Sequence, residues 1–207
     1  MVRSLTRIIQ PPFVPELRIR VADTLTPTWE ATERYFGHAV QPPFWAFVWP
    51  GSQALARLML DSPDLVSGKR VFDFGSGCGL AAIAAIKCGA VSTVACDADP
   101  LAASAQEVNA LLNGVTLQSL TADPTHAPLE DVDLVLAGDV CYERSAALRN
   151  TSWLRTHAEM GVQVLLADPG RAYAPSSGLE LIAEYEVPTT RELETAESLH
   201  TTVWRVA

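Results

Sequence analysis

The sequence has no long apolar run, no zinc-like cysteine spacing and no run of basic residues, and each absence excludes a class of protein. No stretch of the 207 residues approaches the roughly 18 apolar residues of a membrane-spanning helix. The formal net charge is −9 at pH 7, which argues against a general nucleic-acid binder, because such a protein needs a basic surface to neutralise phosphates. An acidic protein is better matched to a basic group on a protein partner.

The four cysteines lie in apolar or motif segments and lack the spacing of a metal site. We therefore expect them to be small buried side chains of a protein in a reducing compartment, with no bound metal. Residues 1–10 contain two arginines and no acid, a faint transit-peptide pattern, but no clear cleavage site follows. We expect a cytoplasmic, monomeric protein without a membrane partner.

The length suits one domain of generous size, and 48% of the residues are apolar. Residues 1–40 contain four prolines among short apolar runs, with a strand expected at 17–21 and a short helix at 28–36. We interpret residues 1–40 as an N-terminal arm or lid packed on the main fold, and residues 41–207 as the main domain. A loose arm is the alternative.

The stretch from Val71 to Gly79 is the most informative motif of the chain. A short apolar run that contains Asp73 meets glycines at alternate positions, Gly75, Gly77 and Gly79, and an alanine-rich segment follows. This order predicts strand, tight turn and helix: glycine permits the positive φ angles of the turn, and the helix start offers free N–H groups to a ligand. An ordinary glycine-rich turn without a ligand is the alternative.

The spacing of these glycines favours a nucleoside ligand without phosphate. A dinucleotide-binding fold shows Gly-x-Gly-x-x-Gly and holds a pyrophosphate at the helix start, whereas this chain has Gly-x-Gly-x-Gly. Asp73 would repel a diphosphate but suits an ammonium or hydroxyl groups. S-adenosylmethionine carries an amino acid, a ribose and a sulfonium, and the pattern resembles the first motif of the class I S-adenosylmethionine-dependent methyltransferases.

Two further carboxylates follow expected strands. Asp97 ends a strand about twenty residues after the glycine turn, where a carboxylate accepts hydrogen bonds from ribose hydroxyls. Asp99 precedes Pro100, a pair typical of a helix N-cap. Asp123 follows the next strand, where we expect it to accept a hydrogen bond from the adenine amino group.

Strands and helices alternate along the main domain. We expect strands at residues 69–74, 92–97, 115–120, 133–137 and 162–167, and helices at residues 79–88, 101–113, 144–159 and 178–185. Strand signals at 185–187 and 201–206 predict a final hairpin. This order predicts an α/β, Rossmann-like fold, with a seven-stranded, mostly parallel sheet, one antiparallel strand and helices on both faces.

Residues 41–50 are dense in proline and aromatic residues, which are costly to expose. Phe44 and Phe47 are candidates for core packing. Trp49 precedes a helix that we expect to begin near Ser52 and to end before Pro63. At the mouth of that helix Trp49 is a candidate wall of the adenosine pocket.

A polar segment, Gly138 to Tyr142, follows the fourth expected strand. Ligands of open α/β sheets bind at the carboxyl ends of the strands, so this segment faces the site. It contributes Asp139 and Tyr142 as candidate catalytic residues. The alternative is that Asp139 caps the following helix and Tyr142 only packs.

Several motifs together resemble the seven-β-strand protein methyltransferases of family 16, and among them those that methylate lysines of the electron transfer flavoprotein β-subunit. The resemblance covers nearly all of the chain. It includes an Asp-x-x-Tyr motif at Asp139 and Tyr142. The motifs lie at Phe44–Gln53, Gly75–Gly79, Gly138–Tyr142, Asp168–Arg171 and Thr202–Trp204.

The resemblance implies S-adenosylmethionine as cofactor and a protein lysine as acceptor, with the flavoprotein β-subunit as partner. Asp139 would then orient the amine and Tyr142 would wall the lysine channel, while Arg171 would contact the target protein. The alternatives are a small amine or another protein as acceptor, or a binding module that has lost catalysis. Cofactor contacts are expected from Trp49, Asp73, Gly75, Gly77, Gly79, Asp97 and Asp123.

Overall fold

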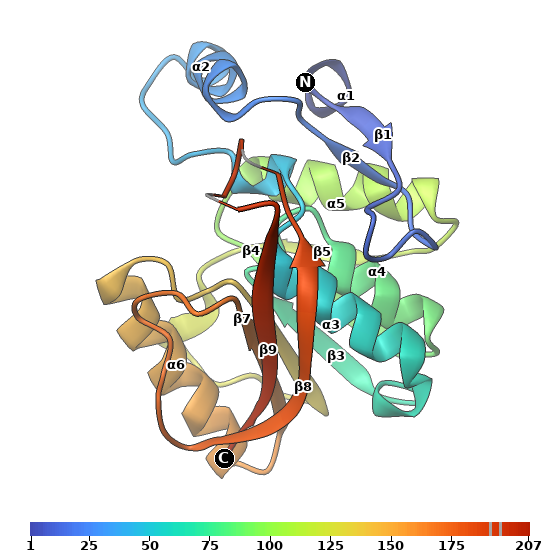
Figure 1. The fold of residues 1–207 in the computed structure, drawn as a ribbon, viewed down its shortest axis with the longest axis vertical. Coiled ribbons are helices and arrows are strands. Elements are labelled where there is room, and N and C mark those ends of the chain that lie inside the picture. The colour runs from blue at the N-terminus through green and yellow to red at the C-terminus, as the bar shows by residue number, and fades with distance from the viewer. Residues whose placement is uncertain (191, 195) are drawn as a thin grey trace.

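A computed structural model describes residues 1–190, 192–194 and 196–207, and its centre is a seven-stranded sheet of order β5-β4-β3-β6-β7-β9-β8 (Figure 1). The five strands from β5 to β7 are parallel, and β9 is antiparallel to both of its neighbours. The predicted fold class is therefore confirmed. The strands are β3 (Arg70–Phe74), β4 (Ser92–Asp97), β5 (Gln118–Thr121), β6 (Leu134–Gly138), β7 (Gln163–Asp168), β8 (Leu179–Pro188) and β9 (Ser198–Val206).

The central strands are buried on both faces, which explains their nearly continuous apolar sequences. In β6 and β7 successive side chains alternate between two hydrophobic clusters. Leu134, Leu136 and Leu165 belong to one cluster, and Val135 and Leu166 to the other. A sheet with a core on each side needs helices on each side to close both cores.

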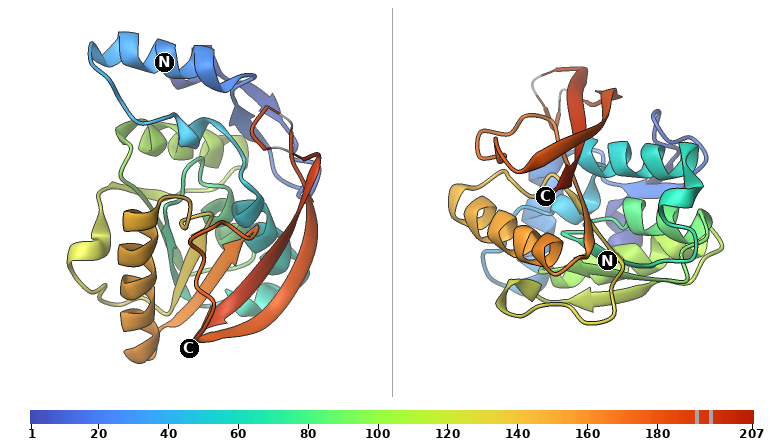
Figure 2. Two further views of the ribbon diagram at one scale, coloured as in Figure 1. Left: turned by 60° about the vertical axis from the view of Figure 1, so that its left-hand side comes forward. Right: turned by 90° about the horizontal axis from the view of Figure 1, so that it is seen from below.

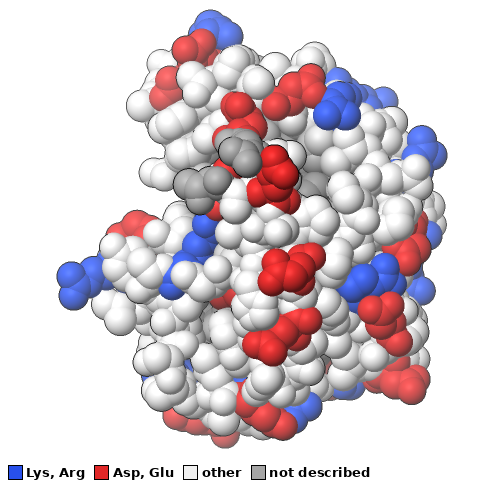
Figure 3. All heavy atoms as spheres, viewed as in Figure 1, with Lys and Arg blue, Asp and Glu red and all other residues white. Residues whose placement is uncertain are grey.

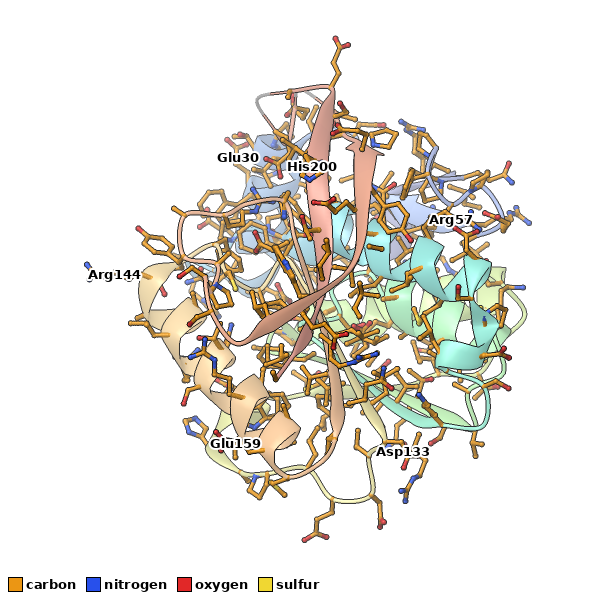
Figure 4. The ribbon with its side chains drawn as sticks, turned by 60° about the horizontal axis from the view of Figure 1, so that its bottom comes forward. Glu30, Arg57, Asp133, Arg144, Glu159 and His200 are labelled. Atoms are coloured by element: carbon orange, nitrogen blue, oxygen red, sulfur yellow. The ribbon has the colours of Figure 1, made fainter. Side chains whose placement is uncertain are left out.

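Helices cover both faces of the sheet (Figure 2). Three of them, α3, α4 and α5, pack side by side on one face, and α6 lies on the other, its two ends marked by Arg144 and Glu159 in Figure 4. As predicted, the Asp99 carboxylate caps α5 by accepting a hydrogen bond from the Leu101 N–H. The helices are α3 (Pro50–Asp61), α4 (Leu80–Lys87), α5 (Pro100–Leu112) and α6 (Arg144–Glu159).

Two helix starts lie earlier in the chain than the sequence predicted. Helix α3 begins at Pro50 rather than near Ser52, because proline at the first helical position lacks only an N–H that has no partner there. Helix α2 (Leu25–Phe36) begins at Leu25 rather than at Thr28. Pro27 falls in its first turn, where a missing N–H breaks no helical bond.

The helix predicted at residues 178–185 is wrong, because residues 179–185 belong to strand β8. Leucine, glutamate and alanine favour a helix there, but helix propensity is a weak preference that tertiary pairing overrides. Strand β8 pairs with β9 from Leu179 opposite Val206 to Pro188 opposite Ser198. The hairpin that it forms completes the sheet.

The N-terminal arm packs on α5. It contains α1 (Val2–Leu5), a small antiparallel sheet of β1 (Arg7–Ile9) and β2 (Ile19–Val21), and α2. The Asn109 side chain accepts a hydrogen bond from the Arg20 N–H at 2.8 Å, and Asn113 exchanges two with the backbone of Arg18. Three short 3₁₀ turns complete the fold: η1 (Phe44–Ala46), η2 (Pro63–Leu65) and η3 (Pro124–His126).

The four cysteines are buried and unpaired, as the sequence predicted. Within the described ranges, no helix is long and apolar enough to cross a membrane. The same residues include no cluster of three or more histidine, cysteine or acidic side chains that could hold a metal ion.

We predict that Asn109→Ala weakens the attachment of the arm. The buried Asn109 side chain also donates to the Cys78 carbonyl at 2.9 Å, so it joins the arm to the segment before α4. Its loss should lower the free energy of unfolding by about 1–3 kcal/mol, measured by urea denaturation, and should speed hydrogen exchange at the Arg20 amide. Glu107→Ala, at an exposed position of the same helix, is the control; equal stability of the two variants would contradict this account.

Candidate active site

A cavity of about 910 Å³ lies at the carboxyl ends of the parallel strands. Its floor comes from the ends of β3, β4 and β6 and from the first turn of α5. Helix α2, residues 38–42 and Leu193 complete its wall from other parts of the chain. The N-terminal arm and the loop between β8 and β9 thus contribute to the site. The position of the cavity at the carboxyl ends of the strands is the one expected for ligands of open α/β sheets.

The glycine turn contributes two of its three glycines to this wall. Gly75 and Gly77 line the cavity, with φ angles of 66° and 50° that favour glycine. Gly79, with a φ of 83°, is the N-cap of α4, and a Cβ there would lie 3.1 Å from Cγ of Gln106 on α5. The third glycine therefore permits helix packing and is not part of the cavity wall.

Asp73 lies beneath the turn. It is 3% exposed, and its carboxylate accepts hydrogen bonds from the Ser76 hydroxyl at 2.6 Å and the Ala82 N–H at 3.1 Å. Burial raises the pKa of this carboxyl to about 7. The structure thus gives Asp73 an anchoring contact with the turn and the start of α4, and it is not among the residues that line the cavity.

Asp97 lines the cavity at the end of β4. Its carboxylate accepts hydrogen bonds from the N–H groups of Gly77 at 2.8 Å and Asp99 at 2.9 Å. Burial raises the pKa of Asp97, and these backbone donors oppose that shift. The same carboxylate therefore fixes the glycine turn and presents an acceptor to the cavity.

Asp123 lies on the same wall, beyond the end of β5. It caps η3 by accepting hydrogen bonds from the N–H and the hydroxyl of Thr125, and its other oxygen is 3.5 Å from Nη2 of Arg149 on α6. Because β4 and β5 are neighbours, Asp97 and Asp123 belong to the same end of the cavity.

Asp139 lies at the centre of a polar cluster after β6. It is 8% exposed and has a φ of 56°, which is rare for a residue other than glycine. One carboxylate oxygen accepts from the Gly51 N–H at the start of α3, and the other accepts from Nη2 of Arg171 at 3.0 Å. Burial raises the pKa of Asp139 to about 6, and the charge of Arg171 opposes this.

Arg171 is the partner of Asp139 that sequence reasoning missed, since it was assigned to contact with a target protein. It follows β7, the neighbour of β6, so the carboxyl ends of the two strands bring the pair together. That neighbourhood could have been inferred from the strand order. The direction of the Arg171 side chain could not, because it depends on Glu194 in the loop after β8, which the guanidinium also contacts at 2.6 Å.

Three aromatic rings stand next to this cluster. Phe44 lies between Trp49 and Tyr142, with ring centroids 5.6 Å and 5.2 Å away. The Arg171 guanidinium is 5.9 Å from the centre of the Trp49 ring. Trp49 therefore stands beside the Asp139–Arg171 pair at the β6–β7 end, whereas Asp123 lies at the β5 end, so the two residues predicted to frame one adenine lie at different ends of the site.

The wall chemistry fits a ligand without phosphate. Among the described lining residues the only arginines are Arg149 and Arg171, and each is paired with a carboxylate. No described lysine lines the cavity. A phosphate would meet Asp97 and Asp99 beside the glycine turn, whereas hydroxyl and ammonium groups would find acceptors there.

The chain resembles known methyltransferases over almost its entire length. It is 35% identical over 199 residues to the electron transfer flavoprotein beta subunit lysine methyltransferase of Danio rerio, covering 93% of this chain and 76% of that protein. The human protein of the same name is 34% identical, with 93% and 75% covered. Residues 54–140 also match the ribosomal protein L11 methyltransferase (PrmA) family.

Solved structures share the fold at low identity. The ribosomal protein L11 methylase of Lactobacillus delbrueckii subsp. bulgaricus is 21% identical at a TM-score of 0.51, covering 76% of this chain and 79% of that one. SMU.776, solved in complex with SAH, is 10% identical at a TM-score of 0.59, covering 98% of this chain and 56% of that one.

We predict that Gly51→Ala disrupts the site, because a Cβ at Gly51 would lie 2.6 Å from both the Ala167 carbonyl oxygen and the Asp139 carboxylate. Such overpacking costs about 1–3 kcal/mol, so the thermal unfolding midpoint should fall. The adjacent Ser52→Ala, which adds no atom, is the control and should lose only the stability of one hydrogen bond to the Trp49 carbonyl. An unfolding midpoint for Gly51→Ala at or above that of Ser52→Ala would refute the close packing.

Proposed function

The chain belongs to the family of electron transfer flavoprotein beta subunit lysine methyltransferases, and from this premise we propose that it transfers methyl groups from S-adenosylmethionine to lysine side chains of that flavoprotein subunit. The identity of 34–36% to the vertebrate enzymes over nearly all of this chain carries the proposal. The cavity with Asp139 and Tyr142 in its wall supports it.

The cavity suits S-adenosylmethionine together with an acceptor side chain. Its volume lies near the top of the usual range for ligand sites, about 300–1,000 Å³. Asp97 would accept hydrogen bonds from the ribose hydroxyls, the backbone at Gly75 and Gly77 would approach the amino-acid part, and Asp123 would accept from the adenine amino group. When bound, the cofactor supplies a methyl group attached to a sulfonium, whose sulfur leaves as a neutral thioether when the methyl group is transferred.

The residues at the β6–β7 end would receive the lysine. A free lysine has a pKa of about 10.4 and is protonated at neutral pH, so the site must hold the amine in line and accept its proton. Asp139 would accept a hydrogen bond from the amine and orient it. Tyr142, Phe44 and Trp49 would wall the channel. This assigns Trp49 to the acceptor side, and Asp73 and Gly79 to support of the glycine turn.

The β8–β9 hairpin presents an acidic face (Figure 3). Glu180, Glu184 and Glu186 are exposed along β8, and acidic side chains gather over this hairpin in the view of Figure 3. A protein segment rich in lysine complements such a face. The cytoplasmic location, the monomeric state and the lack of a nucleic-acid partner remain predictions from the sequence.

The direct test is to incubate purified flavoprotein β-subunit with this protein and S-adenosylmethionine and to measure intact and peptide masses. We expect mass gains in whole methyl increments that map to lysines. Cell extract labelled with tritiated cofactor extends the test to other acceptors. An unchanged β-subunit beside a labelled small amine or another labelled protein would show that the acceptor is wrong.

We predict that Asp139→Ala binds the cofactor normally and loses turnover by about 100-fold or more, because the acceptor amine is no longer oriented. Calorimetry with S-adenosylmethionine measures the first property, and methylation of the β-subunit the second. Normal turnover by this variant would exclude the assigned role.

We predict that Asp97→Asn weakens cofactor binding and largely keeps turnover. The amide keeps the size of the carboxylate but lacks its charge, and a hydrogen bond to a charged group contributes about 1.5–3 kcal/mol. The Kd for S-adenosylmethionine should therefore rise by about tenfold or more, while turnover at saturating cofactor changes much less. Unaltered cofactor affinity would remove Asp97 from the cofactor site.

A further inference from the structure

Arg171 is held in one position by two carboxylates and a ring. Its Nη2 atom donates to Asp139 at 3.0 Å and to Glu194 at 2.6 Å, and Nη1 donates to the second Glu194 oxygen at 3.2 Å. The guanidinium also lies over the Trp49 ring. The side chains of Asp139, Arg171 and Glu194 are only 8%, 22% and 11% exposed, so solvent screens this cluster weakly.

We propose that Arg171, held by Glu194, is a positioning residue that keeps the Asp139 carboxylate ionised and turned toward the cavity, so that Asp139 can accept a hydrogen bond from the methyl-accepting amine. This inference deepens the proposed function and rests on it for the identity of the amine.

The environment of Asp139 explains why such a residue is needed. Burial favours the neutral carboxylic acid, which would donate a hydrogen bond rather than only accept one. Asp168, at the end of β7, adds a like charge that works in the same direction. Two groups oppose them: the Gly51 N–H from α3 and the Arg171 guanidinium.

The other titratable neighbours do not supply this charge. Tyr142 follows Asp139 on the same segment, and Cys141 beside it is buried and free. Arg149, the other arginine of the described wall, pairs with Asp123 at the β5 end. Among the described lining residues, Arg171 is therefore the one cation that contacts Asp139.

Glu194 partly neutralises the charge of Arg171 and fixes the direction of its guanidinium. It comes from the loop between β8 and β9, which also contacts the arm, because Glu192 accepts a hydrogen bond from the Leu25 N–H at the start of α2. Leu193 between these two glutamates lines the cavity. The loop thus ties Arg171 to a segment that closes the site.

Two substitutions that each remove a charge should shift the pKa of Asp139 in opposite directions. Arg171→Gln removes a positive charge beside Asp139 and should raise the pKa of its carboxyl by about one unit or more, since an opposite charge at this distance typically lowers a carboxyl pKa by about 1–3 units. Glu194→Gln removes a negative charge but keeps a side-chain oxygen that can accept a hydrogen bond from Arg171, so the arginine stays in position and the pKa of Asp139 should fall. Arg171→Lys retains the charge and should lie closer to the parent protein than Arg171→Gln.

The measurement is a ¹³C NMR titration of protein labelled at the aspartate carboxyl carbons, with Asp139→Asn to assign the signal. The parent midpoint is expected at about 6. Shifts of opposite sign in Arg171→Gln and Glu194→Gln support the proposal. Equal midpoints in all three proteins, or shifts of the same sign, overturn it. Because each substitution gives its own sign, a folding failure of one variant still leaves the other decisive.

Kinetics connect this charge to the reaction. The rate of methylation should rise with pH through the midpoint of the Asp139 titration, because the ionised carboxylate accepts the hydrogen bond from the amine. The acidic limb of kcat should therefore move to higher pH in Arg171→Gln and to lower pH in Glu194→Gln, whereas a purely structural role would lower kcat without moving the limb. If the flavoprotein subunit is not methylated at all, the proposed substrate fails, and the NMR titration still decides the role of Arg171.

Discussion

The site depends on a close contact between the start of α3 and the carboxyl ends of β6 and β7. Gly51 and Gly138 leave so little room that a Cβ on Gly138 would lie 2.8 Å from the Ser52 nitrogen. This approach lets the Gly51 N–H reach the Asp139 carboxylate. A buried carboxylate without such donors would be neutral or strongly destabilising, so Arg171 and the start of the helix together allow an acid at this position.

A second constraint is the cost of holding several acids near one glycine turn. Asp73 and Asp97 are buried or half-buried, and backbone N–H groups satisfy both: Ala82 for Asp73, and Gly77 for Asp97. Each carboxylate therefore stabilises the turn. Only Asp97 also faces the cavity, so the two acids differ in function although both belong to the same motif.

The cover of the cavity is assembled from segments far apart in the chain. Thr32 and Phe36 of α2, residues 38–42 and Leu193 all line it. The arm is attached near both ends of α5: Asn109 and Asn113 bind its backbone toward the C-terminal end of the helix, and Val2 and Ala22 share a hydrophobic cluster with Leu101 near the helix start. The arm and the first turn of α5 therefore line the same cavity.

Local sequence patterns predicted most of the elements. Alternation and apolar runs gave the parallel strands, and β4 and α6 begin and end where the sequence indicated, because their signals are short-range: side-chain period and terminal residues. The glycine motif predicted the turn for the same reason. The helix prediction at residues 178–185 was wrong because pairing with β9, about twenty positions later in the chain, outweighed the local helix preference.

The sequence by itself therefore determined the order of elements, the glycine turn and the edge of the sheet where the candidate carboxylates gather, since these follow from local backbone preferences and strand direction. Only the tertiary structure decided which side chains meet there. In the structure Trp49 lies beside Arg171, and Gly79 and Asp73 are not part of the cavity wall. One guanidinium, that of Arg171, binds both Glu194 and Asp139. Such contacts depend on the close approach of distant segments, which no local pattern specifies.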